Sequence, residues 1–119
     1  MFYKRSESFR YTFGTPPEIC MQLLDPLSHL ALPSKIYCLL LDISPKGAKL
    51  FSERELEPGE ENVSLQFVLN HETISADATI VWKQQYEEGW MYGADFERNS
   101  IKEMLILNEI RELKEIEMK

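Results

Sequence analysis

The second half of the chain alternates between apolar and polar residues over three successive stretches. An alternation with a period of two is typical of a β-strand that buries one face. The polar connections Asn70-His71 and Glu87-Glu88-Gly89 are so short that they require antiparallel hairpins. The expected buried residues are Val63, Leu65, Phe67 and Leu69, then Ile74, Ala76, Ala78, Ile80 and Trp82, then Trp90, Tyr92, Ala94 and Phe96. We therefore expect three consecutive antiparallel strands.

The first half predicts shorter strands and one loop. The segment from Asp25 to Ser34 contains two prolines and is expected to be a loop. Six or seven short antiparallel strands in one chain favour a closed barrel, because closure removes exposed strand edges. The predicted strands are Phe9 to Phe13, Ile19 to Leu23, Ile36 to Leu41, and Ala48 to Ser52. In the first of these, Arg10 and Thr12 are expected to point away from the aromatic face.

A helix is predicted over residues 100–118. Ser100-Ile101-Lys102-Glu103 fits a capping box, in which the serine and glutamate side chains satisfy backbone amides of the first turn. Ile106, Ile110 and Leu113 then form an apolar stripe. Packing of this stripe on the barrel is favoured, because fewer than three heptads are present. A homodimer through the C-terminal helix is the alternative.

The length of 119 residues predicts a single domain, residues 1–119, whose first 13 residues form an N-terminal arm and first strand. No apolar run approaches the roughly 20 residues that span a bilayer. The polar start lacks the apolar core of a signal peptide, so we expect a cytoplasmic protein. Cys20 and Cys38 lie in apolar surroundings and are expected to be buried free thiols.

The formal net charge of −7 argues against binding to DNA or to an anionic membrane, since phosphate binding needs a basic surface. The N-terminal arm is locally basic, because it carries Lys4, Arg5 and Arg10 against Glu7. An anionic ligand is therefore expected to bind near the arm.

The sharpest local motif is Asp42-Ile43-Ser44-Pro45-Lys46-Gly47, which stands between two predicted strands and by itself predicts a tight turn. It is followed by Val81-Trp82 and by Gly93-Ala94-Asp95-Phe96 in the last two predicted strands. With these residues the chain resembles the PilZ family, which pairs a D/N-x-S-x-x-G motif with an R-x-x-x-R motif near the N-terminus. The resemblance covers nearly the whole chain in the same order.

The resemblance implies an all-β fold, a six-stranded antiparallel PilZ-like β-barrel with a C-terminal α-helix. It also implies a receptor or adaptor for the bacterial messenger cyclic di-GMP, which changes its surface on binding and signals to an unidentified protein partner. The resemblance implies that Arg5 and Arg10 hold phosphate or guanine and that Lys4 assists them. It implies that the opposing guanine-binding turn is formed by Asp42, Ser44 and Gly47.

One part of the R-x-x-x-R motif is off register in this chain. Arg10, which precedes an apolar strand, fits the second arginine, but Ser6 stands four residues earlier and Arg5 is displaced by one. The alternative is therefore a degenerate PilZ-like domain that binds no nucleotide and acts as a protein-protein interaction module.

No pattern in the sequence indicates catalysis or a bound metal. His29, His71, Cys20 and Cys38 lack the spacing of a zinc site, and neither a glycine-rich phosphate loop nor a nucleophile elbow is present. We expect no enzyme activity, no metal and no resident cofactor.

Overall fold

A computed structural model describes residues 9–59 and 61–118 of the protein. Within these residues the chain forms seven strands followed by one helix. The elements are β1 (Tyr11–Thr12), β2 (Glu18–Leu24), β3 (Ala31–Ser44), β4 (Gly47–Ser52), β5 (Asn62–Val68), β6 (Thr73–Tyr86), β7 (Gly89–Phe96) and α1 (Ser100–Glu117).

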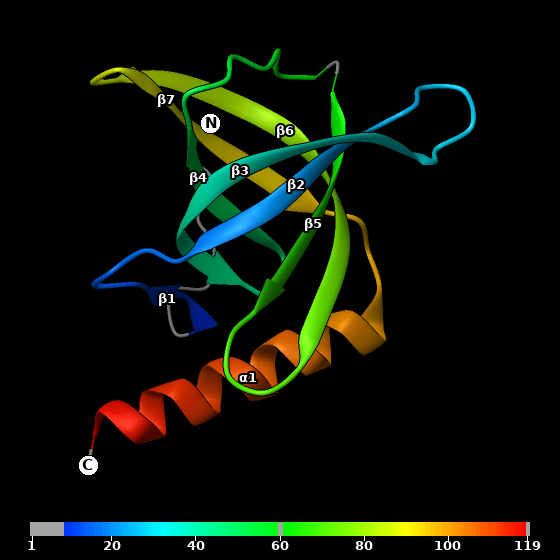
Figure 1. Ribbon diagram of the computed structural model, residues 1–119. Coiled ribbons are helices and arrows are strands. Elements are labelled where there is room, and N and C mark those ends of the chain that lie inside the picture. Colours follow the sequence, from blue (N-terminus) through cyan, green and yellow to red (C-terminus); the bar gives the residue numbers. More distant parts are fainter. Residues whose placement is uncertain (1–8, 60, 119) are drawn as a thin grey trace, which may run out of the picture.

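Six of the described strands close into an antiparallel barrel (Figure 1). They pair in the order β3, β2, β5, β6, β7 and β4, and β4 pairs back with β3. The short strand β1 extends this sheet beside β3, with Tyr11 opposite Ile43 and Thr12 opposite Asp42. The predicted six-stranded barrel with a C-terminal helix is confirmed.

The inward side chains of the strands form one hydrophobic core. Cys38 belongs to it, and burial raises the pKa of its thiol to about 12, which keeps it protonated and unreactive. Cys20 is partly buried, and both cysteines are free thiols as expected. The largest fully buried side chains are those of Tyr92, Met21, Leu40, Ile43, Leu50, Leu56, Leu65, Ile74, Ile80, Ile106, Ile110 and Val63.

Helix α1 covers one end of the barrel (Figure 1). Ile106 and Ile110 are buried there and Leu113 packs against the core, so the apolar stripe faces the barrel rather than a partner helix. The buried carboxylate of Glu109 accepts hydrogen bonds from three backbone N–H groups of the β5–β6 turn, at 2.8–3.1 Å. The helix is therefore fixed by both apolar and polar contacts.

The helix begins at Ser100, but its cap differs from the predicted one. Asn99 is the N-cap residue, since its backbone is extended and its side-chain oxygen accepts from the N–H of Lys102 at 3.0 Å. Glu103 reaches back to the N–H of Asn99 at 3.3 Å. Among the described residues no helix combines the length and apolar character needed to cross a bilayer.

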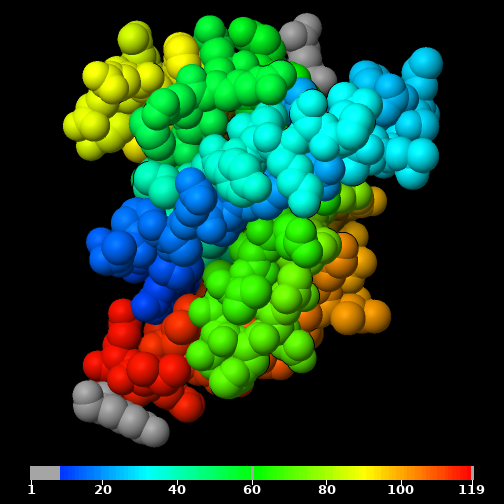
Figure 2. Space-filling model, viewed as in Figure 1, coloured from blue at the N-terminus to red at the C-terminus, as the bar shows by residue number. Residues whose placement is uncertain are grey.

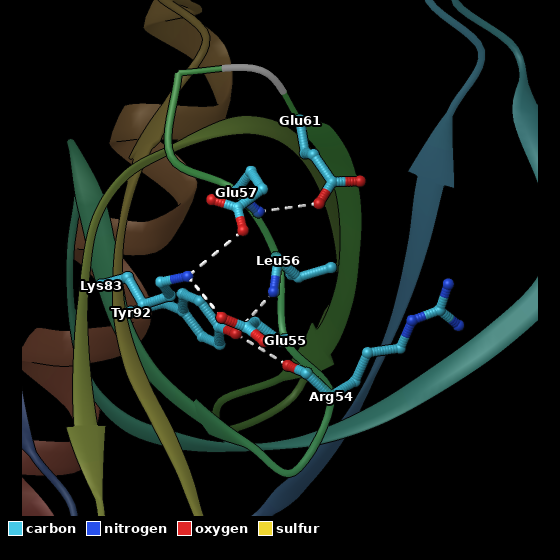
Figure 3. Close-up of polar contacts among 7 residues, drawn as sticks. All are labelled: Arg54, Glu55, Leu56, Glu57, Glu61, Lys83 and Tyr92. Atoms are coloured by element: carbon cyan, nitrogen blue, oxygen red, sulfur yellow. Dashed lines mark hydrogen bonds and ion pairs between the residues drawn. The ribbon is translucent and has the colours of Figure 1, made fainter.

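The opposite end of the barrel is closed by the chain between β4 and β5 (Figure 3). Leu56 inserts there and is 1% exposed, and we call the segment from Arg54 to Leu56 the plug. The hydroxyl of Tyr92 accepts from the N–H of Leu56 and donates to the carbonyl of Arg54, both at 2.7 Å. Outside this plug the Lys83 ammonium lies 2.7 Å from a Glu55 carboxylate oxygen and 3.4 Å from one of Glu57.

The β2–β3 hairpin projects from the body of the molecule (Figure 2). Because β3 already begins at Ala31, the predicted loop from Asp25 to Ser34 is shorter than expected. The Asp25 carboxylate accepts from the N–H groups of Ser28 and Leu27 at 2.8 and 3.1 Å. This turn holds Leu27 and Leu30 outward at the tip, where both are exposed.

Candidate functional site

The Asp42–Gly47 motif forms the turn from β3 to β4. Ser44 and Gly47 are the paired residues on either side of Pro45 and Lys46. The Ser44 hydroxyl donates to the carbonyl of Gly47 and accepts from the N–H of Lys46, both at 3.4 Å. The predicted tight turn is confirmed, and its residues end one strand and start the next at a defined register.

Asp42 begins a row of residues that crosses the outer face of the barrel. It pairs with Lys49 of β4, Lys49 pairs with Gly93 of β7, and Gly93 pairs with Trp82 of β6. Thr12 of β1 continues the row on the other side of Asp42. Paired residues in antiparallel strands point to the same face. The row therefore gathers a carboxylate, an ammonium and an indole from three parts of the sequence.

Two register shifts in the strand pairing determine the direction of the side chains of Asp42 and Trp82 in this row. The register shifts between Leu40 and Asp42 in β3, and again between Ile80 and Trp82 in β6. An extra residue in a strand reverses the face of the side chains that follow. Leu40 and Ile80 point into the core, so Asp42 and Trp82, two residues later, point outward instead of inward.

Trp82 was predicted on the buried face of its strand, and this prediction is wrong. Its side chain is 41% exposed because of the register shift. The indole lies over Gly93, where a Cβ atom would overlap the ring. The absence of a side chain at Gly93 thus lets the aromatic ring lie close to the backbone of the neighbouring strand.

The row borders a groove of about 510 Å³, a size that suits a small ligand. Arg10, Lys49, Trp82 and Asp95 line it with polar or aromatic groups. A neighbouring groove of about 620 Å³ shares Asp95 but is lined by further carboxylates, Asp77 and Glu97. Carboxylates repel an anion, so the groove with Arg10 and Lys49 is the candidate site for an anionic ligand.

The carboxylate of Asp42 lies beside this groove and is nearly buried. Asp42 is 3% exposed, and its Oδ2 lies 3.8 Å from the ammonium of Lys49. A buried carboxylate requires a positive or hydrogen-bond-donating neighbour. Lys49 is such a neighbour in the structure.

The structure brings together four of the residues predicted for the site. Asp42, Ser44 and Gly47 share one turn, and Arg10 lies next to β1, which pairs with β3 at Asp42. Arg10 also lines the groove, in agreement with its predicted outward direction. Lys4 and Arg5 lie outside the described residues.

Sequence reasoning missed Lys49 and Gly93 as site residues. Lys49 lies two residues after the Asp42–Gly47 motif and Gly93 begins the Gly93–Phe96 stretch, but only the cross-strand register places them in the row. The period-two pattern of its strand placed Trp82 in the core. Among the described residues, no group of three or more His, Cys, Asp or Glu side chains could hold a metal ion.

Comparisons with known proteins agree with this architecture. The family model of the PilZ domain matches residues 4–113. The solved structure of the Bacillus subtilis inhibitor of motility (MotI/DgrA) is 14% identical, with a TM-score of 0.66 over 98% of this chain and 55% of the other. No curated protein sequence matches the chain.

A second similar structure is that of YcgR from Escherichia coli in complex with c-di-GMP. It is 16% identical, with a TM-score of 0.68 over 92% of this chain and 46% of the other. The chain thus spans about half the length of each of these two proteins. At such low identity the likeness establishes the fold.

Proposed function

The chain belongs to the PilZ domain family, and from this premise we propose that it is a receptor for cyclic di-GMP. The observation that carries the proposal is the groove beside the Asp42–Gly47 turn, which Arg10, Lys49 and Trp82 line. The receptor would change its surface on binding and so signal to a protein partner. This function requires binding and no chemical reaction.

The ligand presents chemical groups that match the residues of the groove. Its two phosphates are anionic, and its two guanines offer acceptors at O6 and N7, donors at N1 and N2, and flat aromatic faces. The guanidinium of Arg10 can bind a phosphate or the O6/N7 edge with paired hydrogen bonds. Asp42 can accept from N1 and N2 while Ser44 adds a hydroxyl, and Gly47 allows close approach.

The exposed indole of Trp82 gives the groove a stacking surface. Stacking of a base on an aromatic side chain contributes about 1–3 kcal/mol and does not depend on hydrogen bonds. A guanine that stacks on Trp82 would lie in the groove that Arg10 also lines. Arg5 and Lys4 keep their proposed roles as further phosphate or guanine ligands from the N-terminal arm.

Calorimetric titration of the full chain with cyclic di-GMP tests this function. We expect the wild type to bind, and Arg10→Ala and Asp42→Ala to lose binding while they remain folded. Arg98→Ala is the matched control, since Arg98 is exposed and does not line the groove. Absence of both heat and a thermal shift in the wild type at high ligand concentration would contradict the receptor function.

The projecting β2–β3 hairpin favours a second function, that of a protein-protein interaction module. Its turn is held by hydrogen bonds to Asp25, yet it exposes the apolar side chains of Leu27 and Leu30. Exposed apolar groups on a fixed protrusion are typical of a contact with another protein. If the titration shows no nucleotide binding by the folded chain, this second function is the one that the structure supports.

A further inference from the structure

Lys49 is the second positively charged residue among the described residues that line the groove, beside Arg10. The two cations come from different parts of the chain, because Arg10 precedes β1 whereas Lys49 lies in the middle of β4. The flanking residues Ala48 and Leu50 are buried in the core, so Lys49 must point outward. Its position in the groove is therefore set by the barrel and does not depend on the N-terminal arm.

The contact between Lys49 and Asp42 is long, and its lysine partner is partly exposed to solvent. The Nζ–Oδ2 distance of 3.8 Å is longer than a hydrogen bond, and the Lys49 side chain is 36% exposed, whereas that of Asp42 is only 4% exposed. An ion pair with a solvated partner contributes little to stability. The flexible stem of a lysine also lets its ammonium move while the backbone stays in place.

A cyclic dinucleotide has hydrogen-bond donors that can bind Asp42 and phosphate oxygens that can bind Lys49. The donors at guanine N1 and N2 can replace the ammonium at the Asp42 carboxylate, and a phosphate oxygen can replace the carboxylate at the Lys49 ammonium. Both charges then remain compensated in the complex. The exchange is possible without movement of β3 or β4.

We propose that Lys49 binds a phosphate of the ligand and is the second cation of the site, the role that the R-x-x-x-R pattern assigns to Arg5. The inference rests on the proposed function, since it names a contact with the same ligand. It explains how a chain whose first arginine is off register can still bind an anionic dinucleotide. Affinity then depends on Arg10 and Lys49 more than on Arg5.

Titration of four variants with cyclic di-GMP tests the proposal. Lys49→Met is expected to weaken binding at least about tenfold, the effect of one lost charged hydrogen bond, and to reduce the salt dependence of the affinity. Lys49→Arg keeps the charge and should keep most of the affinity. Arg5→Ala should weaken binding less than Lys49→Met. Lys35→Met is the matched control, because Lys35 is an exposed lysine of β3 that does not line the groove.

A double-mutant cycle separates phosphate binding from mere support of Asp42. If Lys49 binds phosphate, Lys49→Met weakens binding in the Asp42→Asn background as well. If Lys49 only holds Asp42 in place, Lys49→Met has no effect in that background and the proposal is wrong. Wild-type affinity in Lys49→Met, or a larger loss in Arg5→Ala, also overturns it. A wild type that binds no ligand removes the proposed function itself, which is a different result.

Discussion

At the scale of single residues, Gly93 and the register shifts in β3 and β6 determine the shape of the candidate site. The register shifts in β3 and β6 turn Asp42 and Trp82 outward, although residues two positions earlier point into the core. Gly93 then allows the indole to lie on the backbone of β7. Irregular positions like these are frequent next to binding sites, because they redirect a side chain without altering the rest of the sheet.

Gly93→Ala tests the contact between Trp82 and β7. The added methyl group would overlap the indole, so the ring must move, and we expect a loss of about 1–3 kcal/mol in the free energy of unfolding. The fluorescence of Trp82, measured in a Trp90→Phe background, should change as well. Gly14→Ala is the control, since a Cβ at Gly14 meets no atom within 4 Å. Equal stabilities and unchanged emission would mean that the indole does not lie on Gly93.

At the scale of elements, regular strands could be predicted and irregular ones could not. In β5 the alternation of Val63, Leu65 and Phe67 identifies the buried face, and the structure agrees. In β6 the same reasoning fails at Trp82, because an apolar pattern does not show where the pairing shifts by one residue. The helix cap is a milder case, since asparagine and serine both cap helices and only the extended backbone of Asn99 decides between them.

Those residues of the candidate site that form a local motif could be predicted from the sequence. Asp42, Ser44 and Gly47 are close in sequence, so their spacing reveals the turn. Lys49, Gly93 and Trp82 come together only through the pairing of β4, β7 and β6. The sequence contains no local signal for that register, and a structure is needed to find those residues.

Glu109 joins α1 to the β5–β6 turn and makes this contact sensitive to acid. Burial raises the pKa of its carboxyl, but hydrogen bonds from the N–H groups of His71, Glu72 and Asn70 outweigh burial and hold the pKa below its ordinary value. A carboxylate with a lowered pKa stabilises the fold above its unfolded-state pKa of about 4.3. That contribution is lost as the pH falls through the folded-state value.

Glu109→Gln is therefore expected to lower the free energy of unfolding at pH 7 by about 1.5–3 kcal/mol, the range for hydrogen bonds to a charged group. The difference from the wild type should shrink below about pH 4, where the native carboxylate also becomes protonated. Urea unfolding at several pH values measures both effects. Glu115→Gln, at an exposed position of the same helix, should change little. A difference that is constant with pH would argue against the capping role.

The plug at the other end of the barrel depends on one hydroxyl. Tyr92→Phe leaves the N–H of Leu56 and the carbonyl of Arg54 without this partner, in a part of the barrel where Leu56 is buried. We expect a loss of about 1–3 kcal/mol in thermal or urea unfolding. Tyr37→Phe serves as the control because Tyr37 is exposed. Equal losses in the two variants would contradict a specific role for the Tyr92 hydroxyl.

At the scale of the whole molecule, α1 contacts both parts of the candidate site from below the barrel. Near its start, Glu103 lies 3.6 Å from Lys46 of the Asp42–Gly47 turn. At its end, Glu117 accepts a hydrogen bond of 2.7 Å from the hydroxyl of Tyr11, the residue after Arg10. A ligand that binds Arg10 would thus affect the last turn of the helix through Tyr11.

Tyr11→Phe tests this connection, because it removes the hydroxyl while the ring that packs beside Phe13 is kept. Without ligand, amide hydrogen exchange in the last turn of α1 should rise by about two- to fivefold, as expected for the loss of one hydrogen bond of roughly 1 kcal/mol. With cyclic di-GMP, exchange in that turn should slow in the wild type and respond less in Tyr11→Phe. Tyr37→Phe should behave as the wild type in both conditions. If Tyr11→Phe leaves exchange unchanged without ligand, the hydroxyl does not hold the helix end. If the wild type binds ligand and the last turn does not respond, the helix does not report on the site.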